Sequence, residues 1–578
     1  MRKQRIVPGR LAPAYEVELG RLRANQVIPR LWAREAGLWK NDAAHAETIA
    51  NRLGWLSAVE AMRAEAADLI AFGSEVAAAG LRDLVLLGMG GSSLAPEVFS
   101  LLFPAPADGR RFFVLDTTDP ESLLAVERSV HLARTLFIVA SKSGKTIETL
   151  SQFSYFHNRL NQAGVASPGR NFIAITDAGS RLDVLAQEHD FRRVFRNPAD
   201  IGGRYSALSY FGLVPAALWD VDVNAVLDAA AEMEAACGPQ APAEANPALA
   251  LGAFLGAAAL SGSGTLFLLS ARNLEPLGNW IEQLVAESTG KDGQGIVPVV
   301  AGAAAPAAIL AEGCVTVALT FEGQEDAALQ STLEALKHGS APVAEIRMAG
   351  PADLGAEFFR WEVATALAGI SLSIDPFDEP NVQESKDATA RLLLGFETTG
   401  EMPQGSLSLA ESGLELYTAP GTRHAVQALQ VSEALRTFFS RRRPGDYLAL
   451  LAYVARDAEN AAALESLRHR LAERLAMPVL LGYGPRYLHS IGQLYKGGPA
   501  AGMFIVITSH KAEDLSIPGA RYTFAQLQMA QALGDLQCLA QRDKPVLRLH
   551  LAQGARAGLA ALRKIVDEAL AASRPAAP

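Results

Sequence analysis

Two short segments place glycines, hydroxyls and lysines directly after apolar runs of strand length. GMGGSS (residues 88–93) follows LVLL and precedes a helical pattern, and SKSGKT (residues 141–146) follows TLFIVA in the same way. Glycine lets the backbone approach a ligand closely, and a helix N-terminus presents unpaired N–H groups that bind anions. The segments therefore predict a phosphate or carboxylate site built from their glycines, hydroxyls and lysines. The alternative is a pair of tight turns with serine caps and solvated lysines.

A candidate base lies near the end of a predicted helix. Glu287 is found in WIEQLVAESTGK, and Gln283, four residues earlier, shares its face of the helix. Gly290 ends the pattern, so the negative end of the helix dipole lies close to this carboxylate. A carboxylate in this position needs either a cationic partner such as Lys291 or a functional reason. The alternative interpretation is an exposed ion pair between Glu287 and Lys291.

Two further side chains have both a structural and a chemical interpretation. Arg204 lies in GGRYS (residues 202–206), where it could pair with Asp200 or hold a developing oxyanion. His489 lies in YLHSIGQLYKGG (residues 487–498). Histidine is suited to proton transfer near neutral pH, although a lone histidine is more often structural.

Composition excludes several classes of function. The 578 residues include 52 Lys and Arg against 62 Asp and Glu, a net charge of −10, so no general basic field attracts nucleic acid or an anionic membrane. The three cysteines, Cys237, Cys314 and Cys538, are too far apart in sequence for a metal motif or a disulfide framework. With no long apolar run and no signal-like start, the sequence predicts a cytoplasmic protein without a metal site, and no other cofactor is expected.

The elements that would position these residues form two series of short strands alternating with helices. This alternation predicts an α/β fold of doubly wound parallel sheets, which bind ligands beyond the carboxyl ends of their strands. We expect a helical segment over residues 1–80, a first α/β domain over 81–245 and a second over 246–552, then a helix and tail over 553–578. Residues 395–445 carry the weakest pattern and are expected to be an insertion.

Taken in chain order, the segments resemble the signatures of phosphoglucose isomerase. GMGGSS, SKSGKTIET, GGRYS, QLVAESTGK, IDPFDEPNV (residues 374–382) and LHSIGQLYKGG occur in the order of that family, over about residues 80–535. The sequences of these segments are most similar to the isomerase portion of fused transaldolase–phosphoglucose isomerases. There is no room here for a transaldolase barrel, which needs roughly 200 residues or more.

The resemblance implies two sugar-isomerase domains and the conversion of glucose 6-phosphate to fructose 6-phosphate in glycolysis and gluconeogenesis. It implies that Glu287 is the base, that Gln283 lies beside the substrate, that Arg204 steadies the enediol and that His489 opens the sugar ring. It also implies which residues of the two glycine-rich segments hold the phosphate: Gly91, Ser92, Ser141, Lys142, Ser143 and Thr146. In the family the histidine comes from the partner subunit, so the resemblance also implies a homodimer with a shared active site.

One position departs from the family pattern. Asp535 stands where the family commonly has a lysine, so either Lys496 or Lys291 replaces that cation or ring opening depends on His489 alone. The alternative functions are an isomerase for mannose 6-phosphate or an amino sugar phosphate, and a non-catalytic sugar-phosphate-binding protein. A regulator of this second kind should carry a basic DNA-reading module, and none is visible in the sequence.

Overall fold

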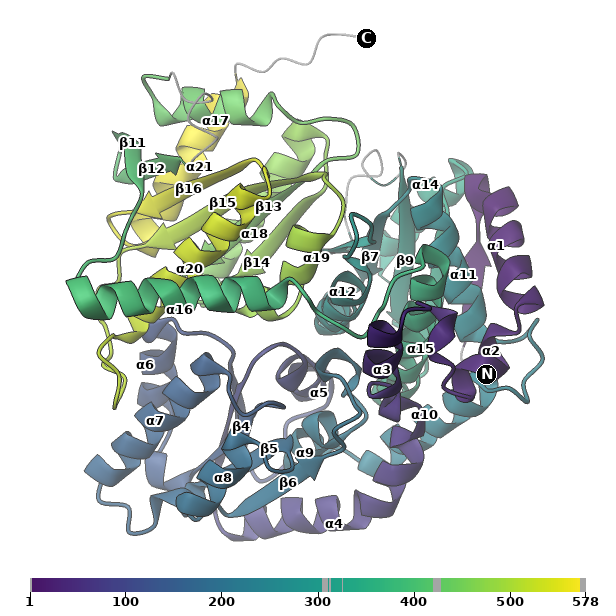
Figure 1. The fold of residues 1–578 in the computed structure, drawn as a ribbon, viewed down its shortest axis with the longest axis horizontal. Helices are drawn as coiled ribbons and strands as arrows, with labels where there is room; N and C mark the ends of the chain where they lie inside the picture. The colour runs from purple at the N-terminus through teal and green to yellow at the C-terminus, as the bar shows by residue number, and fades with distance from the viewer. Residues whose placement is uncertain (1–2, 304–309, 311–312, 325, 419–427, 572–578) are drawn as a thin grey trace. The chain divides into compact units, whose positions relative to one another are not determined.

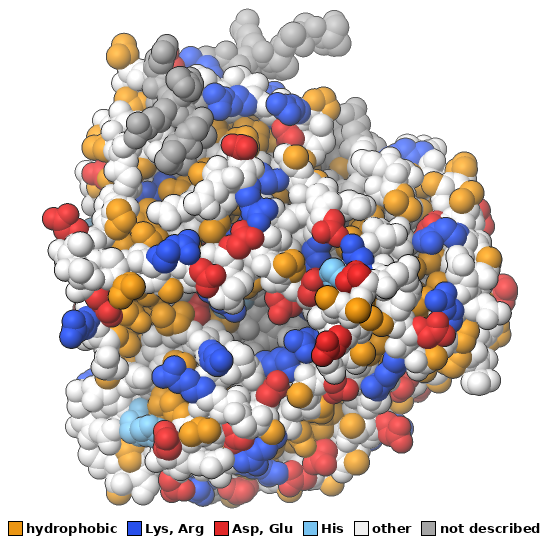
Figure 2. All heavy atoms as spheres, in the orientation of Figure 1, with side chains coloured by type: hydrophobic (Ala, Val, Ile, Leu, Met, Phe, Trp, Pro, Cys, Tyr) orange, Lys and Arg blue, Asp and Glu red, His pale blue; other side chains and the backbone are white. Residues whose placement is uncertain are grey.

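The computed structural model describes residues 3–303, 310, 313–324, 326–418 and 428–571 (Figure 1). The chain divides into two compact units, of which the first comprises Met1–Asp116 and Val130–Glu379. The second comprises Thr117–Ser129 and Pro380–Pro578. Among the described residues, no helix has the length and apolar character needed to cross a membrane. Basic and acidic side chains are interspersed on the face shown in Figure 2.

The first sheet of the first unit is entirely parallel, with the order β3-β2-β4-β5-β6. Its strands are mostly continuous apolar runs because helices cover both faces. The N-terminal elements are β1 (Lys3–Val7), α1 (Ala12–Ala24), α2 (Val27–Trp32), α3 (Ala43–Ala50) and α4 (Ala58–Ala78). The sheet and its helices are β2 (Asp83–Gly88), α5 (Leu94–Leu102), β3 (Arg111–Leu115), β4 (Thr135–Ala140), α7 (Ile147–Gln162), β5 (Phe172–Asp177), α8 (Arg181–Glu188), β6 (Arg193–Asn197) and α9 (Tyr210–Leu218).

The second sheet of this unit has the order β1-β10-β9-β7-β8, in which only the edge strand β1 is antiparallel. The strands are β7 (Thr265–Ser270), β8 (Val297–Ala301), β9 (Cys314–Phe321) and β10 (Val343–Met348). The helices are α10 (Val223–Cys237), α11 (Pro247–Leu260), α12 (Glu275–Thr289), α14 (Ala327–His338) and α15 (Leu354–Leu372). Every residue of α15 is buried, since it packs against α10, α11 and α12.

The second unit contains a third sheet, with the order β11-β12-β16-β15-β13-β14. Its strands are β11 (Ser406–Glu411), β12 (Leu414–Thr418), β13 (Tyr447–Tyr453), β14 (Val479–Tyr483), β15 (Gly502–Ser509) and β16 (Val546–Leu551). Its helices are α6 (Pro120–Ser129), α16 (Val382–Thr399), α17 (Val431–Phe439), α18 (Ala458–Leu475), α19 (Gly492–Gly497), α20 (Phe524–Gln541) and α21 (Ala555–Ala571). The apolar residues of α17, α18 and α21 form one core with this sheet.

The predicted α/β class with parallel sheets is confirmed, but the predicted division of the chain needs correction. Residues 246–552 hold two sheets, and the boundary between the units falls at residue 380. The sequence pattern shows that strands alternate with helices. It does not show which strands pair in the same sheet. The expected insertion at 395–445 contributes β11, β12 and α17, while its residues 419–427 lie outside the described chain.

Four neighbouring parallel strands in each sheet follow one order. The series β3-β2-β4-β5, β8-β7-β9-β10 and β14-β13-β15-β16 are equivalent, because in each the first strand lies between the second and the third. The chain changes direction across the sheet at that point, and ligands of such sheets bind beyond the carboxyl ends of the two strands that flank it. Two of these edges matter below.

Candidate active site

Both glycine-rich segments lie at one edge of the first sheet. Gly88 ends β2 and is paired with Ala140, which ends the neighbouring strand β4. The chain then forms a 3-10 turn, Gly90–Ser92, after β2 and the loop of residues 141–146 after β4. The two segments, which are about 50 residues apart in sequence, therefore start side by side.

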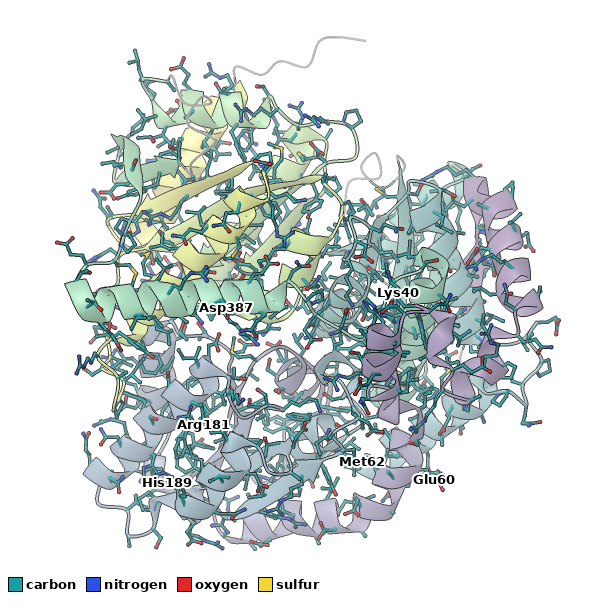
Figure 3. The ribbon with its side chains drawn as sticks, in the orientation of Figure 1. Lys40, Glu60, Met62, Arg181, His189 and Asp387 are labelled. Atoms are coloured by element: carbon teal, nitrogen blue, oxygen red, sulfur yellow. The ribbon has the colours of Figure 1, made fainter. Side chains whose placement is uncertain are left out.

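The loop after β4 leads into a helix whose N-terminus is available to an anion. Thr146 is the N-cap of α7, and no side chain accepts a cap hydrogen bond there. The hydroxyls of Ser141 and Thr146 lie 2.9 Å apart, and Ser143 is exposed. Gly144 has φ +64°, and a Cβ on it would lie 2.4 Å from the Leu182 nitrogen, so the turn requires glycine. Arg181, labelled in Figure 3, begins α8 beside this turn.

Lys142 lies in the same loop, but its ammonium group is already engaged. It donates to Asp177 Oδ2 and to the Ala199 carbonyl, both at 2.7 Å. An anion would have to exchange with one of these partners, so the charge of Lys142 is partly compensated. Its neighbour Lys145 is exposed.

Sequence reasoning missed one hydroxyl in this loop region. Thr149 lies three residues after Thr146 in the first turn of α7, is fully buried, and its Oγ1 has no hydrogen-bond partner in the described structure. A buried hydroxyl without a partner costs free energy unless something else binds it. Thr149 is three residues after Thr146 and so lies on the same face of the helix, which is the sequence signal that could have identified it.

The turn after β2 brings the arginine segment to this edge. A Cβ on Gly91 would lie 2.0 Å from the Gly203 carbonyl oxygen, so only glycine permits this approach. Gly203 begins the 3-10 turn Gly203–Tyr205, which contains Arg204. GMGGSS and GGRYS are thus in backbone contact.

Arg204 is buried and fully bonded. Its Nε donates to Ser288 Oγ at 2.9 Å, and its Nη2 donates to the carbonyls of Pro376 and Asp378 at 2.8 and 2.7 Å. Its Nη1 lies 3.0 Å from Glu379 and 3.2 Å from Glu287. The alternative in which Arg204 pairs with Asp200 is wrong, since the carboxylates it contacts are Glu379 and Glu287.

Glu287 lies in the last turn of α12 and is 8% exposed. One carboxylate oxygen contacts Arg204, and the other accepts a hydrogen bond of 3.0 Å from Gln283 Nε2. Lys291 instead pairs with Asp378 at 2.9 Å, so the reading of Glu287 as an exposed partner of Lys291 is wrong. Burial raises the pKa of Glu287 above its ordinary value, Arg204 opposes that shift, and Glu379 adds to it.

The pKa of Glu379 is shifted in the opposite direction to that of Glu287. Partial burial raises its pKa, but the Arg204 guanidinium outweighs this, so the pKa of Glu379 lies below its ordinary value. Two carboxylates on one guanidinium therefore have pKa values displaced in opposite directions, a pattern found where two acids have different chemical tasks.

Among the residues that the structure describes, one group of side chains has the ligand types of a metal site, and the sequence did not indicate it. Ligand atoms of His45, Asp375 and Asp378 lie within 4.8 Å of one another. Lys291 donates to the Asp375 carbonyl and contacts Asp378. A cation is therefore already in place beside these carboxylates, and the group carries no assignment as a metal site.

His489 belongs to the second unit, in the 3-10 turn Arg486–His489, and is half-buried. Two residues before it, Tyr487 donates to Asp535 Oδ2 at 2.7 Å. Lys496 pairs with the other oxygen of Asp535 at 2.6 Å, and both side chains are buried. Of the two proposed replacement cations, Lys496 is thus the one in contact with Asp535.

Comparison with known proteins identifies the family. A model of the phosphoglucose isomerase family matches residues 57–305. The chain is 30% identical over 348 residues to a probable glucose-6-phosphate isomerase of Haloquadratum walsbyi, covering 54% of this chain and 79% of that protein. A similar protein of Methanococcus maripaludis is 27% identical over 356 residues, with 55% and 80% covered. This chain belongs to the phosphoglucose isomerase family.

Solved structures agree with the fold of this family. A glucose-6-phosphate isomerase of Chlamydia trachomatis superposes with a TM-score of 0.54 at 20% identity, covering 67% of this chain and 86% of that one. A hypothetical protein of Thermus thermophilus gives 0.58 at 24% identity, with 67% and 99% covered. The narrower resemblance to the isomerase portion of fused transaldolase proteins stays a prediction.

Proposed function

We propose that this chain interconverts D-glucose 6-phosphate and D-fructose 6-phosphate, with Glu287 as the base. The observation that carries the proposal is the buried Glu287 carboxylate with a raised pKa, held between Arg204 and Gln283. A carboxylate whose pKa is raised toward neutrality accepts a proton from carbon more readily than an ordinary one. Family membership supports the same reaction.

The chemistry needs one proton transfer in each direction. Glu287 removes the proton from C2 of the open-chain aldose, leaving a cis-enediol, and returns it to C1 to form the ketose. Arg204 stabilises the negative charge that develops on the oxygens of the intermediate when its Nη1 exchanges the contact with Glu287 for these oxygens. Glu379, with its lowered pKa, remains ionised and keeps the guanidinium in position.

The phosphate would be bound by the loops after β2 and β4. Gly91, Ser92, Ser141, Ser143 and Thr146 supply N–H and hydroxyl donors there, and we add Thr149 because its buried hydroxyl lacks a partner. Lys142 contributes only if it exchanges its bond to Asp177 or to the Ala199 carbonyl. Binding at this distal group would fix the reacting carbons against Glu287.

Ring opening is assigned to His489 by its match to the family pattern. We propose a homodimer in which this histidine comes from the partner subunit, so that each active site uses residues of both chains. We also propose that the enzyme is cytoplasmic, which is supported by three buried cysteines that form no disulfide within the described residues.

The test is an assay of the purified chain with fructose 6-phosphate, coupled to detection of glucose 6-phosphate. Glu287→Gln should lower kcat by about 100-fold or more while KM changes little, because only proton transfer is removed. Glu282→Gln, at a half-buried glutamate five residues earlier on α12, is the matched control and should retain activity. Full turnover by Glu287→Gln would remove the assignment of the base.

A further inference from the structure

Strand β16 of the third sheet carries polar side chains on one of its two faces. Along β16, Leu547, Leu549 and Leu551 belong to the core formed with α17, α18 and α21. The residues between them, Arg548 and His550, point to the opposite face, where Arg548 contacts Met529 of α20. Sheets covered on both faces normally carry apolar side chains on both. This polar face has no part in the proposed isomerase site.

A cavity of about 440 Å³ lies over this polar face. Its wall includes Tyr453 at the end of β13, Thr508 and Ser509 at the end of β15, and His550 on β16, together with residues of β12 and the first turns of α20. These are the carboxyl ends of strands that flank the change of direction in the third sheet, where such folds bind ligands. The volume suits a small molecule. None of these residues falls within the stretch, 57–305, that the family model matches.

A buried cation without a carboxylate partner lies directly behind this wall. Arg548 is fully buried and forms no ion pair with any carboxylate of the described residues. It donates to the Gln404 carbonyl at 2.6 Å and stacks on the Tyr417 ring at 3.8 Å, and both residues line the cavity. Burial lowers the pKa of Arg548 to about 10, so it stays charged at neutral pH. Buried charges are normally paired. Arg548 does not itself line the cavity, so an anion there would compensate its charge across Gln404 and Tyr417 without direct contact.

The carboxylates at the cavity are already bound by other groups. Asp514 accepts the Ala525 N–H at 2.9 Å and so caps α20, and Glu415 accepts the Tyr417 hydroxyl at 2.7 Å. Lys511 is in contact with Asp119. None of these three carboxylates, Asp514, Glu415 and Asp119, contacts Arg548, so they do not neutralise its charge directly.

Donors and acceptors for hydroxyl groups line the same cavity. Ser509 Oγ is buried and has no hydrogen-bond partner in the described chain. Thr508 Oγ1 lies 3.0 Å from His550 Nδ1, and burial, reinforced by Arg548, lowers the pKa of His550 to about 4. The imidazole is neutral at pH 7, so it can both accept and donate a hydrogen bond.

We propose that this cavity binds a small polyhydroxylated anion, of the class of sugar phosphates or sugar acids, at a site separate from Glu287. The site goes beyond the isomerase function and does not depend on it. Its ligand places its charge toward Arg548 and its hydroxyls toward Ser509, Thr508 and His550.

Calorimetric titration of the full chain tests the proposal. All proteins carry Glu287→Gln, so that turnover adds no heat, and the probes are fructose 6-phosphate, gluconate and neutral glucose. We expect two fructose 6-phosphate sites per chain, of which Ser143→Ala with Thr146→Ala weakens only one. Ala525→Phe, which fills the cavity from α20, should remove the other, and Ala540→Phe at the far end of the same helix should leave both.

The two anions distinguish a phosphate from a carboxylate ligand. If gluconate but not fructose 6-phosphate is lost in Ala525→Phe, the ligand class is the sugar acid. Glucose should bind this site about tenfold more weakly or worse, since it carries no charge for Arg548 to attract. Should Ala525→Phe fail to fold, Ser509→Leu fills the same cavity. A single binding event per chain for fructose 6-phosphate with none for gluconate, or glucose binding as tightly as the anions, would overturn the proposal.

Discussion

Arg204 shares its guanidinium between two glutamates with different surroundings. The side chain of Glu287 is 11% exposed and has a raised pKa, whereas the side chain of Glu379 is 45% exposed and has a lowered pKa. The cation therefore does not hold both acids in one protonation state. In the proposed mechanism Glu287 exchanges the proton and Glu379 serves as the permanent counter-ion.

The pH dependence of activity should follow the pKa of Glu287. Because that pKa is raised, the carboxylate gains its proton at a higher pH than an ordinary glutamate, and kcat/KM falls as the pH drops through it. Gln283 lowers this pKa by donating to the charged form, so Gln283→Leu should move the acid limb of kcat/KM to still higher pH. Gln187→Leu, on the exposed face of α8, should leave the profile unchanged. An acid limb that stays in place in Gln283→Leu would contradict the assignment.

At the scale of elements, helix α7 is the part of the structure that presents the phosphate donors. Its N-terminus lacks a side-chain cap, and its first turn holds the unpartnered hydroxyl of Thr149. Helix α20 differs, because Thr523 and Gln526 form a capping box and Asp514 accepts a further N–H. The two helices begin at equivalent edges of their sheets, yet only α7 leaves its N-terminus open to an anion.

Thr149→Val should separate binding from stability. Loss of a hydrogen bond to a charged phosphate should raise KM for fructose 6-phosphate by about tenfold or more. The melting temperature should not fall, because valine replaces a buried hydroxyl that has no partner in the free protein. Thr365→Val on α15, which is also buried and unpartnered, is the control and should leave KM unchanged. A lowered melting temperature with unaltered KM would assign Thr149 to the core instead.

The glycine-rich segments were predictable because their signal is local: glycine, hydroxyls and a strand end all fall within six residues. The contacts of Arg204 were not, because Pro376, Asp378 and Glu379 lie more than 170 residues away in sequence. Strand β16 was overlooked although Leu547 to Leu551 alternate apolar and polar side chains. The division into three sheets depends on which strands pair, and single-strand patterns do not contain that information.

At the scale of the whole molecule, the proposed shared active site predicts complementation between inactive chains. Glu287→Gln and His489→Ala should each be nearly inactive alone. In mixed dimers, one of the two sites would combine an intact Glu287 with an intact His489. Co-expression in equal amounts should therefore restore about a quarter of wild-type activity.

Each variant expressed alone is the baseline, and light scattering establishes that dimers form. Mixed dimers that are present but remain inactive would show that each chain uses its own histidine. A monomeric active enzyme would exclude the shared site altogether.

The chain passes between its two units three times, after residues 116, 129 and 379. The second unit therefore takes in thirteen residues, 117–129, that are synthesised some 250 residues before the rest of it. Within it Thr118 donates to Gln531, and Asp119 contacts Lys511 and Gln528. A fragment starting at residue 380 would lack Asp119, the carboxylate that Lys511 contacts, and Thr118, the donor to Gln531. The two units are interlocked in sequence, and no single cut yields both of them intact.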